Sequence, residues 1–396
     1  MNSKEEFLNF QAQTNPSPYL IEVERAEGIY IYDKNNKPFL DMIAGVAVNN
    51  IGHNHPKVIQ AIKNQVDKHL HVMVYGEFIQ EAQLNFSKKL ISLLPDNLNC
   101  VYTVNSGTEA NEAALKLVKR VTGRTELISF YGSYHGSTHG SLSVSGNETK
   151  KTAFRPLLPD VRFLEFNSLQ DLQQITSKTA GVIIETIQGD AGVRVPSQNF
   201  MTSLRKRCDE VGTLLIFDEI QCGIGRTGKM FAFEHFDVVP DILTLGKALG
   251  GGMPIGVLVA SKENLQKFTY DPMLGHITTF GGHPVICASA NACLDVMKSE
   301  IDFNEVERLG KLLEDLISSE SEIKEIRRIG MLFAFDMESF ERVEKVVKKC
   351  LEKGLISFWF LSHPYSFRLS PPLNITEHQV NEAIKLILEA LDEISN

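Results

Sequence analysis

A lysine and an aspartate each follow an apolar, β-branched run of this sequence, where charged side chains are unusual. Lys247 closely follows the run DILTL (241–245) and begins a stretch of glycines and small residues. Partial burial of such an ammonium group lowers its pKa, so the amine can attack an aldehyde. Asp218 lies at the end of an apolar run in TLLIFDEI (213–220), where it needs a partner, and a protonated pyridine ring would provide one and accept electrons from a substrate carbanion. A solvated lysine and a structural salt bridge are the simpler alternatives.

The segment VNSGTEANEAALKL (104–117) has the pattern of a strand, a tight turn and a helix. Thr108 is a good helix N-cap, and Gly107 lets the backbone approach a ligand closely. Together with Ser106, these residues place hydroxyl and free N–H groups at a helix N-terminus, which favours phosphate binding. A capped helix without a ligand would show the same pattern.

Two further segments could complete such a site. In SFYGSYHGSTHGSLSVSG, Tyr134 and His135 lie among glycines after an apolar run, and the aromatic side chain could stack on a flat ring. In HITTFGGHP, Thr278 and Thr279 precede two glycines and could give a second phosphate contact. Loop residues without a ligand, and an ordinary turn, are the alternatives for these two segments.

Two other patterns suggest different chemistry. Gly223, Gly225 and Gly228 form a GxGxxG motif, which would indicate a nicotinamide dehydrogenase. No clear helix follows this motif and no acidic residue stands at the expected offset of about 20 residues, so the glycines are expected to shape a loop. His53 and His55 could indicate a metal, but no third ligand is spaced near them and no metal site is expected.

Apolar, β-branched runs alternate with helical stretches through the middle of the chain. These runs are CVYTV, ELISF, GVIIETI, TLLIFDEI, DILTL and IGVLVA, all between residues 100 and 260. Continuous apolar strands between helices predict an α/β fold with a mostly parallel sheet covered by helices on both faces. Ligands of such sheets bind at the carboxyl ends of the strands, where Asp218 and Lys247 would lie.

The two ends of the chain differ from this middle part. Residues 1–55 contain short alternating strands, and the sequence after residue 290 mixes helices and strands. The pattern predicts a large ligand-binding domain over 56–289 and a smaller α+β domain over 290–396, to which the segment 1–55 contributes. How the N-terminal strands pair is left open by the sequence.

The composition of the 396-residue chain favours a soluble, cytoplasmic protein. Its 49 acidic and 40 basic residues give a net charge of −9, which argues against nucleic acid or an anionic membrane as the main partner. No two of its six cysteines have CxxC spacing, which favours reduced thiols. The N-terminus lacks the apolar core of a signal peptide, and no apolar run approaches the roughly 20 residues that span a membrane.

Taken in order, the motifs of this chain resemble those of one family. The segments SGTEANEAALKL, YHGST, ETIQGDAG, IFDEIQCGIGRTG, LGKALGGGMPIG, TTFGGHP and FRLSPPL occur between residues 100 and 373, and FLDMIAGVAVNNIGHNHP precedes them. The set resembles the class III aminotransferases of the fold-type I pyridoxal-phosphate family, the group of ornithine, acetylornithine and 4-aminobutyrate aminotransferases. The resemblance implies a seven-stranded sheet between helices, pyridoxal 5'-phosphate as cofactor and a homodimer with shared active sites.

The resemblance also implies a role for each matching residue. Lys247 would carry the cofactor as a Schiff base and later move the proton, and Asp218 would pair with the pyridine nitrogen. Arg368 would clamp the carboxylate of an amino-acid substrate, and Glu185, beside the cofactor, would pair with this arginine when an ω-amine is bound. The other implied contacts are those of Gly107 and Thr108 with the phosphate, Ser106 and His135 with the cofactor, Tyr134 with the ring face, Gln221 with the ring hydroxyl, Thr279 with the phosphate across the dimer interface, and Ser137 and Thr278 with the substrate.

The reaction implied by the resemblance moves an amino group from an ω-amino acid or ornithine-type donor to a 2-oxo acid such as 2-oxoglutarate. Three departures from the usual motifs are present: Ser137 stands where the acetylornithine branch usually has Arg, Asp190 where Glu is usual, and Thr186 where Pro is usual. Losing a cation at Ser137 should weaken binding of the α-carboxylate of ornithine-type donors. A decarboxylase or aminomutase on the same scaffold is the main alternative, and a non-catalytic cofactor-binding regulator is another.

Overall fold

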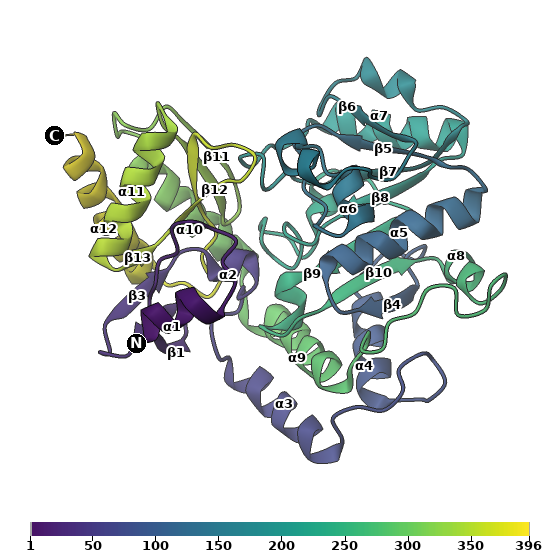
Figure 1. Cartoon of the computed structure of the whole chain (residues 1–396), viewed down its shortest axis with the longest axis horizontal. Helices are drawn as coiled ribbons and strands as arrows, with labels where there is room; N and C mark the ends of the chain where they lie inside the picture. The colour runs from purple at the N-terminus through teal and green to yellow at the C-terminus, as the bar shows by residue number, and fades with distance from the viewer. Residues whose placement is uncertain (1, 396) are drawn as a thin grey trace.

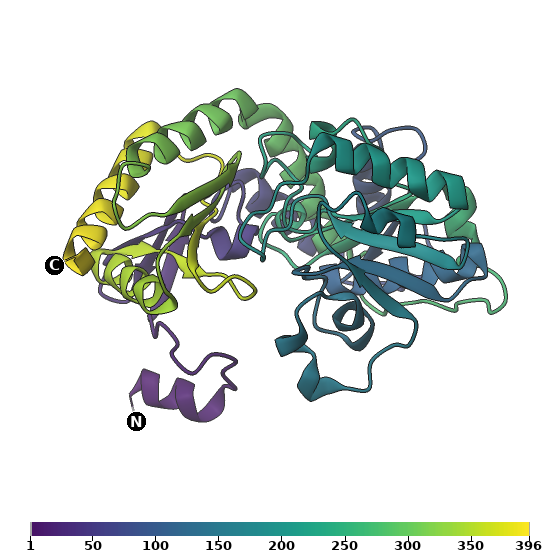
Figure 2. The ribbon, with the colours of Figure 1, turned by 90° about the horizontal axis from the view of Figure 1, so that it is seen from above.

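The computed structural model describes residues 2–395, which fold into two parts that lie side by side (Figure 1). The larger part is built on a seven-stranded sheet, and the smaller part contains two four-stranded sheets. Figure 2 shows the same parts from above, with helix α1 (Ser3–Phe10) projecting from the smaller part. The predicted domain limits at residues 1 and 396 lie outside the described residues.

The seven-stranded sheet has the strand order β4-β10-β9-β8-β7-β5-β6. Neighbours from β9 to β6 pair in parallel, whereas β10 is antiparallel to both β9 and β4. All strands except β10 therefore run in one direction, which confirms the predicted mostly parallel sheet. Their bounds are β4 (Cys100–Val104), β5 (Glu126–Phe130), β6 (Val161–Leu164), β7 (Thr179–Glu185), β8 (Leu214–Asp218), β9 (Ile242–Gly246) and β10 (Gly256–Ala260).

Each of the apolar runs recognised in the sequence forms a strand of this sheet. The sequence pattern does not predict the remaining strand, β6, because VRFL contains the charged Arg162 and only its last residue is buried. An edge strand faces solvent along one side, so it lacks the continuous apolar pattern of the central strands.

Alternate residues of the central strands pack against helices on opposite faces of the sheet. In β8, Ile216 belongs to the apolar cluster that contains Leu117 of α5, whereas Phe217 belongs to the cluster that contains Phe200 of α7. The sheet is thus covered on both faces, as predicted. The helices of this part are α3 (Pro56–Lys68), α4 (Glu81–Ile91), α5 (Gly107–Thr122), α6 (His139–Val144), α7 (Gln198–Val211), α8 (Lys262–Leu265) and α9 (Pro284–Glu300). Among residues 2–395, no helix is both long and apolar enough to cross a membrane.

Helix α5 begins two residues earlier than the predicted cap at Thr108 would place it. The N-cap is Ser106, whose hydroxyl accepts a hydrogen bond from the N–H of Glu109, so the prediction of Thr108 as N-cap is wrong. Ser106 has the extended backbone that an N-cap needs, and Thr108 already lies in the first turn. The Thr108 hydroxyl instead contacts the hydroxyls of Thr138 and Ser141.

The smaller part joins the N-terminal and C-terminal segments of the chain. Strand β3 pairs in parallel with β13, so the N-terminal strands complete a sheet of the C-terminal unit. Its strands are β1 (Val23–Glu27), β2 (Tyr30–Asp33), β3 (Pro38–Asp41), β11 (Glu325–Ile329), β12 (Leu332–Asp336), β13 (Leu355–Ile356), β14 (Phe358–Trp359) and β15 (Ser366–Leu369). Its helices are α2 (Ala44–Ala47), α10 (Phe303–Ile317), α11 (Phe340–Lys353) and α12 (Glu377–Ser395).

The packing of α9 indicates a different boundary between the two domains from the one that the sequence pattern predicts. The predicted limit at residues 289/290 falls inside α9, and α9 packs against α3 and α4 of the larger part. A helix is a single rigid unit, so it belongs wholly to the part on which it packs. We therefore propose that the larger domain extends to Glu300.

The glycine-rich loop at residues 223–228 connects the two parts of the molecule. Arg226 in this loop is 0% exposed, and it donates to the carbonyl oxygens of Met331 at 3.0 Å and Pro371 at 2.6 Å. It also donates to the side-chain oxygen of Asn50. The motif thus shapes a loop, as expected, and its arginine joins segments that lie far apart in the sequence.

Replacing Arg226 with alanine is expected to lower the free energy of unfolding by at least about 3 kcal/mol, because three buried acceptors lose their donor. The melting temperature from calorimetry measures the effect. Arg308→Ala is the control, since Arg308 forms exposed ion pairs of α10 and should matter little. Similarly small shifts in melting temperature for both variants would contradict the proposal that Arg226 stabilises the contact between the two parts.

Candidate active site

Several strands of the large sheet end at one edge, and predicted site residues lie there. β7 ends at Glu185, β8 ends at Asp218, and Lys247 comes directly after β9. The strand register places Glu185 beside Asp218. Because β4 and β5 run in the same direction, the 106–108 turn and Tyr134 follow these strands at the same edge.

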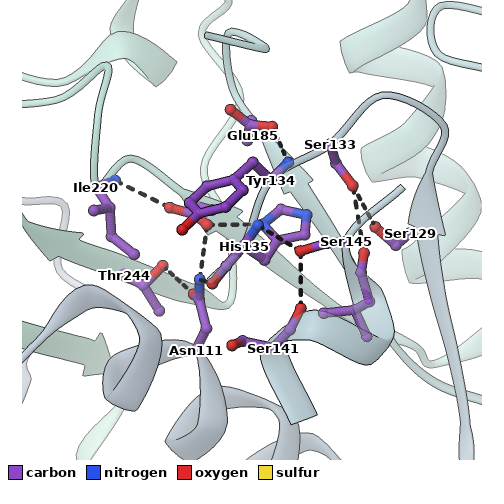
Figure 3. A network of polar contacts seen from close by, with 12 residues as sticks. Asn111, Ser129, Ser133, Tyr134, His135, Ser141, Ser145, Glu185, Ile220 and Thr244 are labelled. Atoms are coloured by element: carbon purple, nitrogen blue, oxygen red, sulfur yellow. Dashed lines mark hydrogen bonds and ion pairs between the residues drawn. The ribbon is translucent and has the colours of Figure 1, made fainter. Parts of the chain in front are cut away.

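The Asp218 carboxylate is 4% exposed and accepts three hydrogen bonds, whose donors His135, Asn111 and Ile220 are labelled in Figure 3. Its Oδ2 accepts from Nδ1 of His135 at 2.7 Å and from Nδ2 of Asn111 at 2.8 Å. Its Oδ1 accepts from the backbone N–H of Ile220 at 3.1 Å. Contact with a carboxylate assigns the ring proton of His135 to Nδ1. This donor set suits a charged carboxylate out of water, which can in turn hold a protonated ring nitrogen.

Asn111 and Thr244 belong to this network, although the sequence reasoning did not find them there. Asn111 is 0% exposed, and its Oδ1 accepts from Oγ1 of Thr244 at 2.8 Å. Asn111 lies four residues after Gly107 and hence on the same face of α5, and Thr244 is the polar residue inside an otherwise apolar strand core. The helical spacing of Asn111 and the polar side chain of Thr244 in an apolar strand are the sequence features that could have indicated their place in the site.

Lys247 begins a 3₁₀ turn, η5 (Lys247–Gly250), immediately after β9. Its φ of 43° is uncommon for a residue with a Cβ atom, and such strain tends to occur at functional sites. Burial lowers the pKa of Lys247, while the negative charge of Asp218 opposes this effect. A lysine with a lowered pKa has more of its amine unprotonated, as attack on an aldehyde requires.

The N-terminus of α5 offers an anion site. The first N–H groups of a helix have no partner within the helix and favour negative charge. A Cβ atom at Gly107 would lie 2.8 Å from the side chain of Ile220, so the turn needs glycine. The hydroxyl of Thr108 follows in the first turn, 2.9 Å from that of Thr138. These groups fit a phosphate.

Tyr134 and Gln221 reach the same edge from the loops after β5 and β8. Tyr134 is 40% exposed, and its hydroxyl lies 3.2 Å from Oγ of Ser137. A partly exposed aromatic ring has a face on which a flat ligand can stack. Gln221 lies so close to Gly189 that a Cβ atom there would overlap its side-chain amide.

Glu185 is bound by backbone groups. Its Oε1 accepts from the N–H of Tyr134 at 2.8 Å, and its Oε2 accepts from the N–H of Gly189 at 3.0 Å. Burial, together with the charge of Asp218, raises the pKa of Glu185 to about 8. Within the described part of the chain, Glu185 forms no ion pair with Arg368, and its role as a gate stays a prediction.

Arg368 is a buried cation with open hydrogen-bond donors. It is 4% exposed, and its guanidinium lies 5.5 Å from the ring centre of Phe358 and 5.4 Å from that of Phe360. Nε has no hydrogen-bond partner, and no described residue forms an ion pair with this guanidinium. Burial accordingly lowers the pKa of Arg368. A planar fork of donors in this state suits a carboxylate ligand.

Asp190 is the carboxylate whose charge acts most on Arg368, opposing the effect of burial on the arginine pKa. Its Oδ1 accepts from the N–H of Leu361 at 3.1 Å, and its Oδ2 accepts from Oγ of Ser362 at 2.8 Å. Asp190 therefore binds a loop of the smaller part beside Arg368. Within the described residues, however, Asp190 forms no ion pair with Arg368.

Thr278 and Thr279 lie on the loop before α9. Oγ1 of Thr278 accepts from the N–H of Gly281 at 2.9 Å, and the carbonyl oxygen of Thr279 accepts from Nε2 of His71 at 3.0 Å. Neither threonine contacts Lys247 or the turn at the start of α5 in these bonds. The contact of Thr279 with a phosphate across a dimer interface stays a prediction.

The histidines considered for a metal have other partners. Nε2 of His53 lies 2.9 Å from Oδ2 of Asp41, and Nε2 of His55 lies 3.2 Å from Oε2 of Glu300. In the part of the chain that the structure describes, no group of three or more His, Cys, Asp and Glu side chains is arranged to hold a metal ion.

The residues at this edge match the chemistry of pyridoxal 5'-phosphate. The helix N-terminus suits its phosphate, Asp218 suits its ring nitrogen, and the amine of Lys247 suits its aldehyde. A Cβ atom at Gly107 would crowd the side chain of Ile220, which follows β8, so only glycine lets this turn pack so closely beside Asp218. The fold and the site together define a pyridoxal-phosphate enzyme of fold type I.

Comparison with known proteins identifies the family. The model of the class-III aminotransferase family matches residues 11–391, so the chain belongs to this family and is a pyridoxal-phosphate-dependent transaminase. Acetylornithine aminotransferase of Methanocaldococcus jannaschii is 40% identical over 382 residues, covering 93% of this chain and 92% of the relative. Acetylornithine aminotransferase of Bacillus subtilis is 35% identical over 374 residues, covering 94% and 95%. The ornithine aminotransferase structure from Toxoplasma gondii is 28% identical with a TM-score of 0.91, covering 100% of this chain and 96% of that one.

These findings confirm the predicted family, the cofactor and the fold, including the seven-stranded sheet. The dehydrogenase alternative is wrong, since the GxGxxG motif shapes a loop of an aminotransferase. The family also favours amino-group transfer over decarboxylation or an aminomutase reaction.

Proposed function

We propose that this transaminase moves an amino group from an amino acid of the ornithine type to a 2-oxo acid, with 2-oxoglutarate as acceptor. The observation that carries the proposal is Arg368, a buried guanidinium that forms no ion pair with any described residue and whose charge also acts on Lys247. A buried cation is costly until an anion joins it, and the carboxylate of an amino or oxo acid is such an anion. The names of the acetylornithine and ornithine aminotransferases above support this substrate class.

Each residue at the sheet edge then has a task. When bound, the cofactor supplies an aldehyde that takes up the amino group and a ring that accepts electrons from the substrate carbon. Nζ of Lys247 moves the proton, Asp218 holds a proton on the ring nitrogen, and Arg368 binds the substrate carboxylate. The residues that we propose to hold the cofactor are Ser106, Gly107, Thr108, Tyr134, His135 and Gln221, together with Thr279 from a second copy.

A screen of amino donors against 2-oxoglutarate tests this proposal. Ornithine, N-acetylornithine, 4-aminobutyrate, β-alanine and lysine would each be added to the purified holoenzyme while the visible absorption is followed. We expect at least one donor to convert the cofactor and 2-oxoglutarate to restore it. A protein that stays colourless in the presence of pyridoxal phosphate, or that decarboxylates every donor, would contradict the proposal.

Replacing Ser137 with arginine is expected to raise kcat/KM about tenfold or more for donors with a carboxylate far from the reacting amine. Ser137 lies beside the Tyr134 hydroxyl at the exposed side of the site, and a guanidinium there would add a charge-assisted hydrogen bond. The measurement compares N-acetylornithine with an alkylamine of similar length that has no carboxylate. An equal change for both donors would show that Ser137 does not face the substrate carboxylate.

We further propose that the chain is a homodimer with shared active sites. Exposed apolar side chains gather on the segments 66–84 and 270–280, next to Thr279, and Ile79 is 93% exposed. A surface of this kind is typical of an interface with another chain. Ile79→Asp is expected to shift the protein toward monomers in sedimentation and to weaken cofactor binding, whereas Leu316→Asp on α10 should do neither. A monomer with full activity at nanomolar concentration would contradict the shared site.

We also propose a cytoplasmic location. All six cysteines are free thiols and five of them are buried, which supports a reducing compartment. Cell fractionation with an antibody to the protein tests the proposal, and recovery outside the cytoplasm would contradict it.

A further inference from the structure

Asn111 uses its whole side-chain amide inside the protein. Its Nδ2 donates to Oδ2 of Asp218 at 2.8 Å and to the carbonyl oxygen of His135 at 2.7 Å. Its Oδ1 accepts from Oγ1 of Thr244 at 2.8 Å. Both Asn111 and Thr244 are 0% exposed. A buried polar network in which every group is paired is rigid, and loss of one member affects the others.

These contacts permit only one orientation of the amide. If the amide were turned over, its oxygen would face the carboxylate of Asp218 and the carbonyl of His135, which are both acceptors. The contact with Thr244 alone would not decide the matter, because a hydroxyl can donate or accept. The two acceptors therefore fix the amide, and the fixed amide requires the Thr244 hydroxyl to donate to Oδ1.

The amide also connects three elements of the proposed site. Asn111 lies on α5, one turn after the proposed phosphate-binding residues. Thr244 lies on β9, in register with Asp218 of β8 and three residues before Lys247. The pair thus joins the helix N-terminus, the aspartate and the strand that ends at the lysine (Figure 3).

We propose that Asn111, oriented by Thr244, is a positioning residue that holds the Asp218 carboxylate as the acceptor for the protonated ring nitrogen of the cofactor. The inference rests on the proposed role of Asp218. Asn111 donates a neutral hydrogen bond, so it stabilises the carboxylate without adding a positive charge that would compete with the ring. A merely structural role in packing α5 against β9 would affect every ligand of the site equally.

The test compares two ligands of the apoenzyme: pyridoxal phosphate, and its deaza analogue in which a CH group replaces the ring nitrogen. Both carry the same aldehyde and phosphate. The dissociation constant of the deaza analogue divided by that of pyridoxal phosphate therefore isolates the contact with Asp218. We expect Asn111→Ala to reduce this ratio about tenfold, as the loss of a hydrogen bond to a charged group implies. Thr244→Val, which keeps the side-chain shape, should reduce it less, and Thr244→Ser should leave it unchanged.

Asp218→Asn separates the inference from the proposed function. If Asp218→Asn lowers the ratio but Asn111→Ala and Thr244→Val do not, the positioning role of Asn111 is wrong and that of Asp218 stands. If Asp218→Asn leaves the ratio unchanged, the proposed partner of the ring nitrogen is itself wrong. Equal weakening of both ligands by Asn111→Ala and Thr244→Val would also overturn the inference, because it is the result of a structural role. The melting temperatures of the apo-variants check that each is folded, and Thr244→Val keeps the test decisive should Asn111→Ala not fold.

Discussion

A Lys247→Ala variant is expected to fold and to bind pyridoxal phosphate, but to lose at least about 10³-fold of kcat. The variant lacks both the amine that attaches the cofactor and the group that moves the proton. Binding should persist because the N-terminus of α5 and the carboxylate of Asp218 are unchanged. Single-turnover absorption with an amino donor, and fluorescence titration with the cofactor, measure the two effects separately.

Lys262→Ala provides a matched control for this variant. Lys262 begins α8, outside the edge at which the site residues gather, so its loss should leave turnover unchanged. If Lys247→Ala kept turnover within about tenfold of the parent, the proton would have to be moved by another group. If it failed to bind the cofactor at all, covalent attachment rather than the helix N-terminus would dominate binding.

Lys247 and Asp218 could be predicted from the sequence for a physical reason. Central strands of a parallel sheet are buried on both faces, so they read as continuous apolar runs, and the first charged residue marks the strand end. Since the carboxyl ends of parallel strands lie at the same edge of a sheet, the strand pattern alone predicts that the two residues lie close together. The same pattern does not find the edge strand β6, because part of this strand faces solvent and its sequence is not continuously apolar.

Contacts between distant segments could not be predicted in this way. Asn111 looks like an ordinary helix residue and Thr244 like an ordinary strand residue, and only the packing of α5 on β9 brings them to Asp218. The N-cap of α5 is similar, because both Ser106 and Thr108 have suitable side chains and the backbone direction decides between them.

Glu185 and Asp190, two carboxylates five residues apart, show most clearly what the sequence cannot predict. A sequence motif gives their order but not which of them comes close to Arg368. In the structure the backbone of Tyr134 and Gly189 binds Glu185, whereas Asp190 reaches the loop beside Arg368. Backbone N–H groups of the loops decide where each carboxylate binds, and the position of a backbone group cannot be inferred from the side-chain pattern.

Replacing Arg368 with alanine is expected to lower kcat/KM for 2-oxoglutarate by about 10²- to 10³-fold. The guanidinium is buried beside Phe358 and Phe360 and forms no ion pair among residues 2–395, so a substrate carboxylate is its natural partner. Loss of one partner of a buried charge pair costs about 3–5 kcal/mol, because the other charge is left unpaired. The effect should be measured with the aminated form of the enzyme, so that only the acceptor half-reaction is observed.

Two comparisons distinguish carboxylate binding by Arg368 from a structural role. Arg368→Lys keeps a positive charge but loses the planar fork and its stacking on the two rings, so its activity with 2-oxoglutarate should lie between those of the parent and of Arg368→Ala. An aldehyde acceptor without a carboxylate should react equally well with the parent and with Arg368→Ala, since it makes no use of the guanidinium. If Arg368→Ala slowed both acceptors alike, Arg368 would be supporting β15 and its aromatic neighbours rather than binding substrate. Because Arg368 forms no ion pair within the described residues, the selective loss is the outcome that the structure leads us to expect.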